Sequence, residues 1–79
     1  MTKNEIFEKI KEILISEFKI DEAAISPDAK MYQDLELDSI DAVDLLVIMK
    51  KYVQGKIVPE QFKKAVTIQD VVDLLFALV

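Results

Sequence analysis

The sequence predicts an all-α fold, a small four-helix bundle with three longer helices, one short helix and a long first loop. Apolar residues recur three and four positions apart in segments near the start, middle and end of the chain. The single glycine and the two prolines fall between those segments. The chain has 79 residues, so we expect residues 1–79 to form one domain.

The first helix is expected over residues 3–18, where Thr2 and Glu5 have the spacing of a capping box. Its apolar stripe consists of Ile6, Phe7, Ile10, Ile13, Leu14 and Phe18. Residues 19–38 show no sustained period, and a helical turn is expected near residues 21–24. Scattered apolar side chains should pin this long loop to the core: Ile20, Ala23, Ile25, Met31, Tyr32, Leu35 and Leu37.

The second helix is expected over residues 39–53, with Asp38 as its N-cap and Gly55 suited to end it. Its apolar positions are broad, because Leu45 and Val47 project to different sides of a helix. This helix is therefore either central in the bundle, which is the interpretation we favour, or partly in contact with another molecule.

The last third of the chain predicts a short helix over residues 59–65 and a final helix over residues 68–78. Pro59 suits the first turn of the short helix. Thr67 and Asp70 have the spacing of a cap for the final one. The buried face of that helix should be formed by Val71, Val72, Leu74, Leu75 and Leu78.

The composition excludes several classes of site and of localisation. Cysteine, histidine, tryptophan and arginine are absent, which excludes disulfides, Cys/His zinc sites, thiol nucleophiles and Ser-His dyads within the chain. The longest apolar run is Leu74–Val79, far below the roughly 18 residues of a membrane span. The N-terminus lacks the pattern of a signal peptide, so a cytoplasmic protein is expected.

The excess negative charge is concentrated in one segment. The net charge is −5, and residues 21–44 hold eight acids and one base, a net of −7. Such a field repels nucleic acid and anionic lipid, and it attracts basic protein surfaces or divalent cations. We therefore expect neither nucleic-acid nor membrane binding. A run of acids also forms an ordinary solvated face, so charge alone does not assign a partner.

Residues 34–41 form the most concentrated polar segment, and calcium binding is one interpretation. Asp34, Glu36 and Asp38 imitate positions 1, 3 and 5 of an EF-hand loop. Position 6 should be glycine and is Ser39, and position 12 should be glutamate and is Leu45. An EF-hand is excluded, only a weak and unspecific divalent site remains open, and no metal site is predicted.

Catalysis and covalent modification are the other two interpretations of this segment. The acids lie at an exposed helix start and no histidine is present to activate Ser39, so no catalytic residue is assigned. Ser39 opens a helix directly after a cap, where a phosphate ester would be favourably placed. An ordinary helix begins with the same residues, and local physical chemistry leaves both interpretations open.

The segment Asp34-Leu35-Glu36-Leu37-Asp38-Ser39-Ile40-Asp41-Ala42-Val43-Asp44-Leu45 resembles the Asp-Ser-Leu/Met segment of acyl carrier proteins. The similarity in helix order and acid placement covers nearly the whole chain. It implies that Ser39 accepts 4′-phosphopantetheine from coenzyme A through a phosphopantetheinyl transferase. The chain would then be a single acyl carrier domain that holds acyl groups as thioesters, is not an enzyme and leaves the chemistry to separate enzymes.

The resemblance also implies roles for neighbouring residues. Acyl-transferring and ketosynthase-type enzymes with basic patches would recognise the chain at six residues: Glu36, Asp38, Ile40, Asp41, Val43 and Asp44. The acyl-chain cavity would be lined by Leu45, Leu46 and Met49. A monomer is expected, because nothing in the sequence indicates obligate oligomerisation.

Two departures from the family pattern favour a specialised carrier. Ile40 stands where leucine or methionine is more usual, and Lys50 and Lys51 stand where carriers of primary fatty-acid synthesis often continue the acidic run. Fatty-acid and polyketide-type pathways both remain open, as does a D-alanyl carrier, whose serine also follows aspartate. A peptidyl carrier fits less well.

The alternative from another class is an unmodified acidic adaptor that binds basic partners. Divalent-cation sensing is a weaker alternative.

Overall fold

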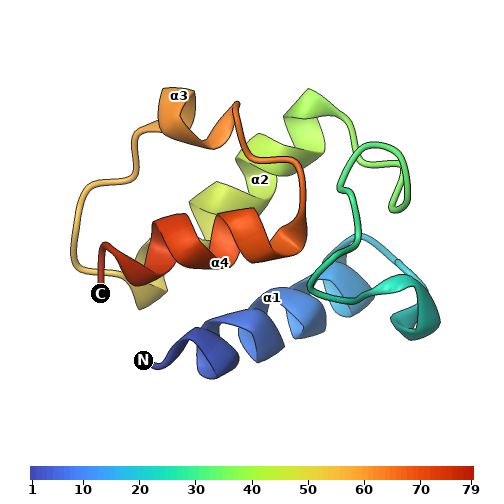
Figure 1. Cartoon of the computed structure of the whole chain (residues 1–79), viewed down its shortest axis with the longest axis horizontal. Helices are drawn as coiled ribbons and strands as arrows, with labels where there is room; N and C mark the ends of the chain where they lie inside the picture. Colours follow the sequence, from blue (N-terminus) through green and yellow to red (C-terminus); the bar gives the residue numbers. More distant parts are fainter.

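The computed structural model describes all residues, 1–79, and contains four α-helices and no strand. The elements, in chain order, are α1 (Lys3–Glu17), the 3₁₀ turn η1 (Glu22–Ala24), α2 (Ser39–Met49), the 3₁₀ turn η2 (Lys50–Tyr52), α3 (Pro59–Phe62) and α4 (Ile68–Phe76). Helix α4 lies in front of α2, α1 runs below them, and the short α3 lies on the opposite side from α1 (Figure 1). The predicted all-α class and the pattern of three longer helices and one short helix are confirmed.

Three helices begin at the capping boxes that the sequence predicts. In α2, the Asp38 carboxylate accepts the backbone N–H of Asp41 at 2.8 Å, and the Asp41 carboxylate accepts the N–H of Asp38 at 3.3 Å. The same reciprocal bonds join the cap residues of α1 and α4. Each pair satisfies N–H groups that a helix start leaves without partners, so residues close in sequence suffice to place these boundaries.

The ends of α2 and α3 differ from the sequence-based expectation. Helix α2 ends at Met49 and tightens into the turn η2, instead of continuing to residue 53. Helix α3 ends at Phe62 rather than at residue 65. The backbone must leave α3 early because Val66, in the connection that follows, bonds to the first loop: its carbonyl accepts the N–H of Met31 at 2.9 Å.

Gly55 does not end α2, so that prediction is wrong. Its φ is not positive, and two residues separate it from η2. Its N–H instead donates to the carbonyl of Leu78 at 2.8 Å. A Cβ at this position would lie 2.9 Å from Leu78 Cδ2, closer than side chains pack. A side chain at position 55 would therefore require Leu78 to shift.

The long first loop is fixed to the start of α4. Besides the Met31–Val66 bond, the N–H of Ile68 donates to the carbonyl of Ala29 at 3.1 Å, and the N–H of Gln69 donates to that of Pro27 at 2.9 Å. Of the expected apolar anchors, Ile25, Met31, Leu35 and Leu37 are buried. Ala23 and Tyr32 are exposed and do not anchor the loop, which corrects that part of the expectation. The expected helical turn is present as η1.

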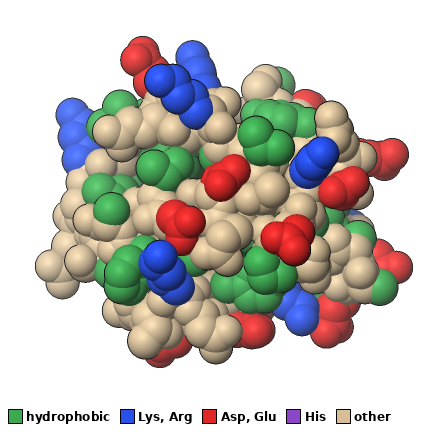
Figure 2. Space-filling view, in the orientation of Figure 1, with side chains coloured by type: hydrophobic (Ala, Val, Ile, Leu, Met, Phe, Trp, Pro, Cys, Tyr) green, Lys and Arg blue, Asp and Glu red, His purple; other side chains and the backbone are tan.

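The surface carries the charged residues, and no polar or charged side chain is buried. On the face of α4 and α1 shown in Figure 2, acidic and basic side chains alternate with apolar ones, so negative charge forms no single patch there.

Asp70 accepts the N–H groups of Val66 and Thr67, and these bonds hold the pKa of its carboxyl below the usual value. No helix has both the length and the apolar character required to cross a bilayer.

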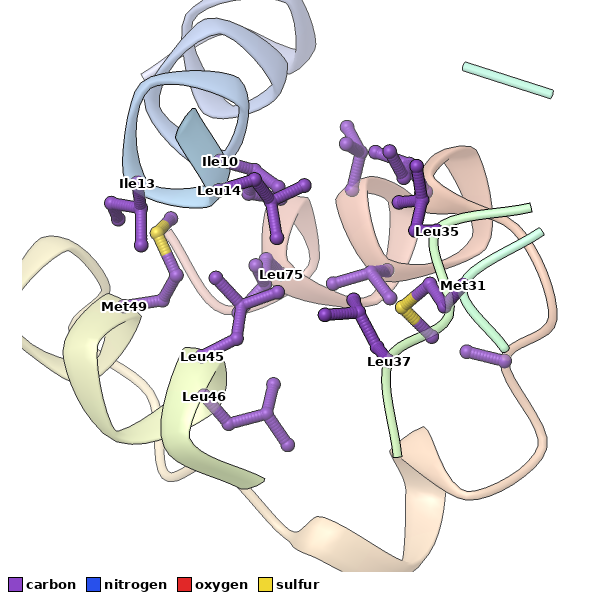
Figure 3. Close-up of a cluster of buried hydrophobic side chains, with 14 of the residues drawn as sticks. Ile10, Ile13, Leu14, Met31, Leu35, Leu37, Leu45, Leu46, Met49 and Leu75 are labelled. Atoms are coloured by element: carbon purple, nitrogen blue, oxygen red, sulfur yellow. The ribbon is translucent and has the colours of Figure 1, made fainter. Parts of the chain in front are cut away.

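The core lies where α1, α2 and α4 meet. Met49 of α2 reaches Ile13 of α1, and Leu45 points toward Leu75 of α4 (Figure 3). Met31, Leu35 and Leu37 of the loop close the other side of this cluster. The largest fully buried side chains are Ile6, Ile10, Leu14, Leu45, Met49, Ile68, Val72 and Leu75. These apolar contacts stabilise the fold, because α1, α2 and α4 each bury several side chains against the others and α3 adds Phe62.

Helix α2 is not buried on all sides. Ile40, Val43 and Val47 are 70%, 46% and 65% exposed, whereas Leu45, Leu46 and Met49 are buried. Positions 40, 43 and 47 follow helical spacing and lie on one outer face. The interpretation of α2 as a central helix is therefore wrong for this face, which is open to another molecule.

Candidate functional site

Ser39 is the first residue of α2, an eleven-residue helix, and it is exposed. The carboxylates of Asp38 and Asp41 are occupied by the backbone N–H groups of the capping box. The Ser39 side chain takes part in none of the side-chain hydrogen bonds of the chain. The hydroxyl is therefore accessible and has no competing intramolecular partner.

A groove between α2 and α3 starts at Ser39. Its first hollow has a volume of about 70 Å³ and is lined by Tyr32, Ser39, Ala42, Val43, Leu46, Pro59, Phe62 and Lys63. The second has a volume of about 200 Å³ and is lined by Val43, Leu46, Val47, Lys50, Lys56, Ile57 and Pro59. The two hollows share Val43, Leu46 and Pro59. The two hollows therefore adjoin each other along α2, and together they are called the groove below.

The residues predicted to recognise partners surround Ser39. Asp41 is half-buried, and the other five are exposed: Glu36, Asp38, Ile40, Val43 and Asp44. None of the four acids takes part in an ion pair within the chain. The structure thus brings together unpaired negative charge and an exposed apolar strip at the start of α2, a combination that suits a basic surface with an apolar centre.

Glu36 has a left-handed backbone conformation, with a φ of 56°. Its neighbours Leu35 and Leu37 are both buried, whereas Glu36 itself is exposed. This conformation brings the Cβ of a non-glycine residue close to a carbonyl oxygen, at a cost of about 1–2 kcal/mol. The Glu36 backbone is therefore strained just before Ser39.

Replacing Glu36 with glycine is expected to raise the free energy of unfolding by about 0.5–1 kcal/mol. Glycine relieves the left-handed strain, and its greater freedom in the unfolded chain offsets about 0.4–1 kcal/mol of that gain. Urea unfolding at equilibrium measures the change. The matched control is Glu36→Ala, which removes the charge but keeps the Cβ and should show no such gain. A Glu36→Gly protein less stable than Glu36→Ala would contradict the strain.

The residues predicted to line an acyl-chain cavity lie inside the bundle. Leu45 and Leu46 border a small hollow of about 10 Å³, which has room for about one water molecule. Met49 is fully buried and lines none of the hollows. The space beside Leu45 and Leu46 is too small for an acyl chain in this conformation, and the hollows of the neighbouring groove are larger.

Sequence reasoning missed most of the groove. Ser39, Val43, Val47 and Lys50 recur at helical spacing, so the α2 wall was available from the sequence. The opposite wall comes from residues in and around α3 that have no local period, and no sequence signal indicates them: Lys56, Ile57, Pro59, Phe62 and Lys63. As for metals, no three acidic side chains of the chain are placed to hold an ion.

Comparison with known proteins assigns the family. A family described as "Phosphopantetheine attachment site" matches residues 8–75. The chain is 41% identical over 78 residues to acyl carrier protein 2 of Ralstonia nicotianae, covering 99% of this chain and 96% of that protein. It is 37% identical over 75 residues to the acyl carrier protein of Petrotoga mobilis (95% and 88%) and 33% identical over 75 residues to that of Thermosynechococcus vestitus (95% and 93%).

These matches span the first helix to the last, so they include the whole groove and the start of α2. They confirm the resemblance stated from the sequence, and with it the prosthetic group, a covalent 4′-phosphopantetheine. The chain belongs to the acyl carrier protein family, whose members are carriers rather than catalysts.

Proposed function

We propose that Ser39 is the attachment residue and that the chain presents acyl thioesters to fatty-acid or polyketide-type biosynthetic enzymes. The observation that carries this proposal is the exposed Ser39 hydroxyl, which has no hydrogen bond within the chain and opens onto the groove between α2 and α3. Residues 1–79 would then act as one carrier domain.

The residues around Ser39 fit a phosphate ester. The start of α2 offers a partial positive charge, and Lys63 lines the hollow next to Ser39. The carboxylates of Asp38 and Asp41 repel a phosphate on Ser39. The ester therefore stays at the surface and does not replace them as acceptors of the capping-box N–H groups. The prosthetic group supplies the thiol that this cysteine-free chain lacks, and acyl groups are held on it as thioesters.

The chain has no base to activate Ser39 by itself. Histidine is absent, and the two nearest carboxylates accept backbone N–H groups. Attachment forms a bond between Ser39 Oγ and phosphorus, breaks the pyrophosphate bond of coenzyme A and releases adenosine 3′,5′-bisphosphate. The hydroxyl proton must go to the phosphopantetheinyl transferase, so the chain acts as the substrate of that enzyme.

Intact-mass spectrometry after incubation with coenzyme A and a phosphopantetheinyl transferase tests the site. We expect one phosphopantetheine per chain, and fragmentation of the modified peptide should locate it on Ser39. An unmodified chain, or a modification on another residue, would overturn the assignment. An unmodified chain that still binds a basic partner would favour the acidic adaptor instead.

We further propose that partner enzymes dock on the start of α2. Glu36, Asp38, Asp41 and Asp44 would meet basic patches, and Ile40 with Val43 would form the apolar centre. Support comes from the unpaired acids and from the exposed apolar strip beside them. Leu45, Leu46 and Met49 would line the cavity for a long acyl chain, which requires the closed interior to open by movement of these side chains.

Reversing the charge at Asp44 is expected to slow association with a partner enzyme about threefold to tenfold at low salt, and to reduce the dependence of that rate on salt. Asp44 is suited to this test because it makes no hydrogen bond or ion pair, whereas Asp41 caps the helix. Stopped-flow association rates of Asp44→Lys measure the effect. The matched control is Glu8→Lys, with the same charge change on the outer face of α1. Equal rates for the two variants would mean that the acids near Ser39 are only solvated.

A further inference from the structure

The end of the groove that lies farther from Ser39 is basic. Lys50 and Lys56 line it together with five uncharged residues, and no acid lines it. Neither lysine forms an ion pair within the chain. Lys51, the neighbour of Lys50, does not line the groove. The far end therefore offers two unpaired ammonium groups on a mainly apolar wall.

The helix dipole accounts for only one of these lysines. Lys50 follows the last residue of α2, where a cation is favourable without any ligand. Lys56 belongs to the connection between η2 and α3 and lies at no helix end. Both lysines are exposed and line the same hollow, so an anion in that hollow would be attracted by both. The shared hollow thus points to a negatively charged occupant.

The length of the groove limits what that occupant can be. Ser39 and Lys50 are eleven residues apart on and just beyond α2, so about 16 Å of helix axis separates them. An extended phosphopantetheine has a comparable length. A group on its thiol end that is only a few atoms long would therefore lie beside Lys50 and Lys56, and a long chain would pass beyond them.

The interior does not compete for an anionic group. The hollow beside Leu45 and Leu46 has a volume of about 10 Å³ and is lined only by hydrophobic residues. A carboxylate buried there would lose its hydration without gaining a partner, which is strongly unfavourable. An acyl group with a terminal carboxylate is therefore held at the surface, in the groove.

We propose that Lys50 and Lys56 form a subsite for the terminal carboxylate of a short dicarboxylic acyl group carried as a thioester. This inference rests on the attachment at Ser39. It deepens the proposed function by naming a class of cargo, and it disfavours aminoacyl cargo such as D-alanyl, whose ammonium group the two lysines repel.

The test compares two acyl groups of equal length, one charged and one neutral. A transferase loads the chain from succinyl-coenzyme A, ¹³C-labelled at the free carboxyl, or from butyryl-coenzyme A. NMR then gives the pKa of the labelled carboxyl and the methyl shifts of Val47 and Ile57. We expect the pKa of the carboxyl to be lower than in free succinyl-pantetheine. The acid dissociation constant should be about threefold larger, as for a weak exposed ion pair. The two methyl groups should shift more with succinyl than with butyryl.

The variant with both Lys50→Gln and Lys56→Gln should lose both effects, and Lys51→Gln should retain them. The subsite is overturned if succinyl and butyryl give equal methyl shifts and the carboxyl titrates as in free succinyl-pantetheine, or if the double variant keeps the effects. These outcomes leave the attachment at Ser39 intact. A chain that accepts neither group overturns the attachment, and the subsite with it.

Discussion

Substituting alanine for Ser39 is expected to abolish attachment of phosphopantetheine and to leave the fold unchanged. The Ser39 side chain is exposed and forms no hydrogen bond, and the start of α2 is held by Asp38 and Asp41. Alanine is favourable in helices, so the free energy of unfolding should stay within about 0.5 kcal/mol of the wild-type value. Intact-mass spectrometry measures the modification, and circular dichroism during urea unfolding measures the stability.

The other two serines provide matched controls. Ser16 and Ser26 are exposed like Ser39, but neither lies at the start of a helix or in the groove. Ser16→Ala and Ser26→Ala should therefore be modified as completely as the wild type. A modified Ser39→Ala chain would show that another residue is the acceptor. A Ser39→Ala chain that has lost its helices would show that Ser39 has a structural role.

Met49→Ala is expected to lower the free energy of unfolding by about 2–5 kcal/mol. Met49 is fully buried at the end of α2 and reaches Ile13 of α1, so its loss leaves a cavity between the two helices (Figure 3). A domain of this size has little stability to lose, and a large fraction of the variant should be unfolded at 37 °C. Urea unfolding followed by circular dichroism measures the loss.

Val47→Ala is the matched control for Met49→Ala. Val47 lies two residues earlier in the same helix and is 65% exposed, so its truncation should change stability by about 0.5 kcal/mol or less. Equal losses at the two positions would contradict the assignment of Met49 to the core and of Val47 to the open face of α2.

Much of the fold follows from contacts between residues close in sequence. The caps at Thr2, Asp38 and Thr67 join groups three positions apart, and they place three helix starts where the sequence predicts them. The same local signal places Ser39 at the first position of α2 with an exposed hydroxyl. Helix ends were predicted less well, because α2 stops where the chain must turn toward α3 and not at a local signal such as Gly55.

The orientation of α2 was ambiguous for a related reason. Its apolar residues cover more than one face, and spacing alone does not tell which face meets α1 and α4. Packing decides that Leu45 and Met49 are inside while Ile40 and Val47 are outside.

The sequence by itself determined the helical class, the helix starts and the acidic segment around an accessible Ser39, because capping and periodicity act between residues a few positions apart. Only the tertiary structure decided the groove, since its second wall comes from residues around α3 that have no local pattern. Lys50 and Lys56 are six positions apart in sequence, and the turn between η2 and α3 brings them to one hollow. Contacts of that kind depend on how the whole chain packs, which no short segment encodes.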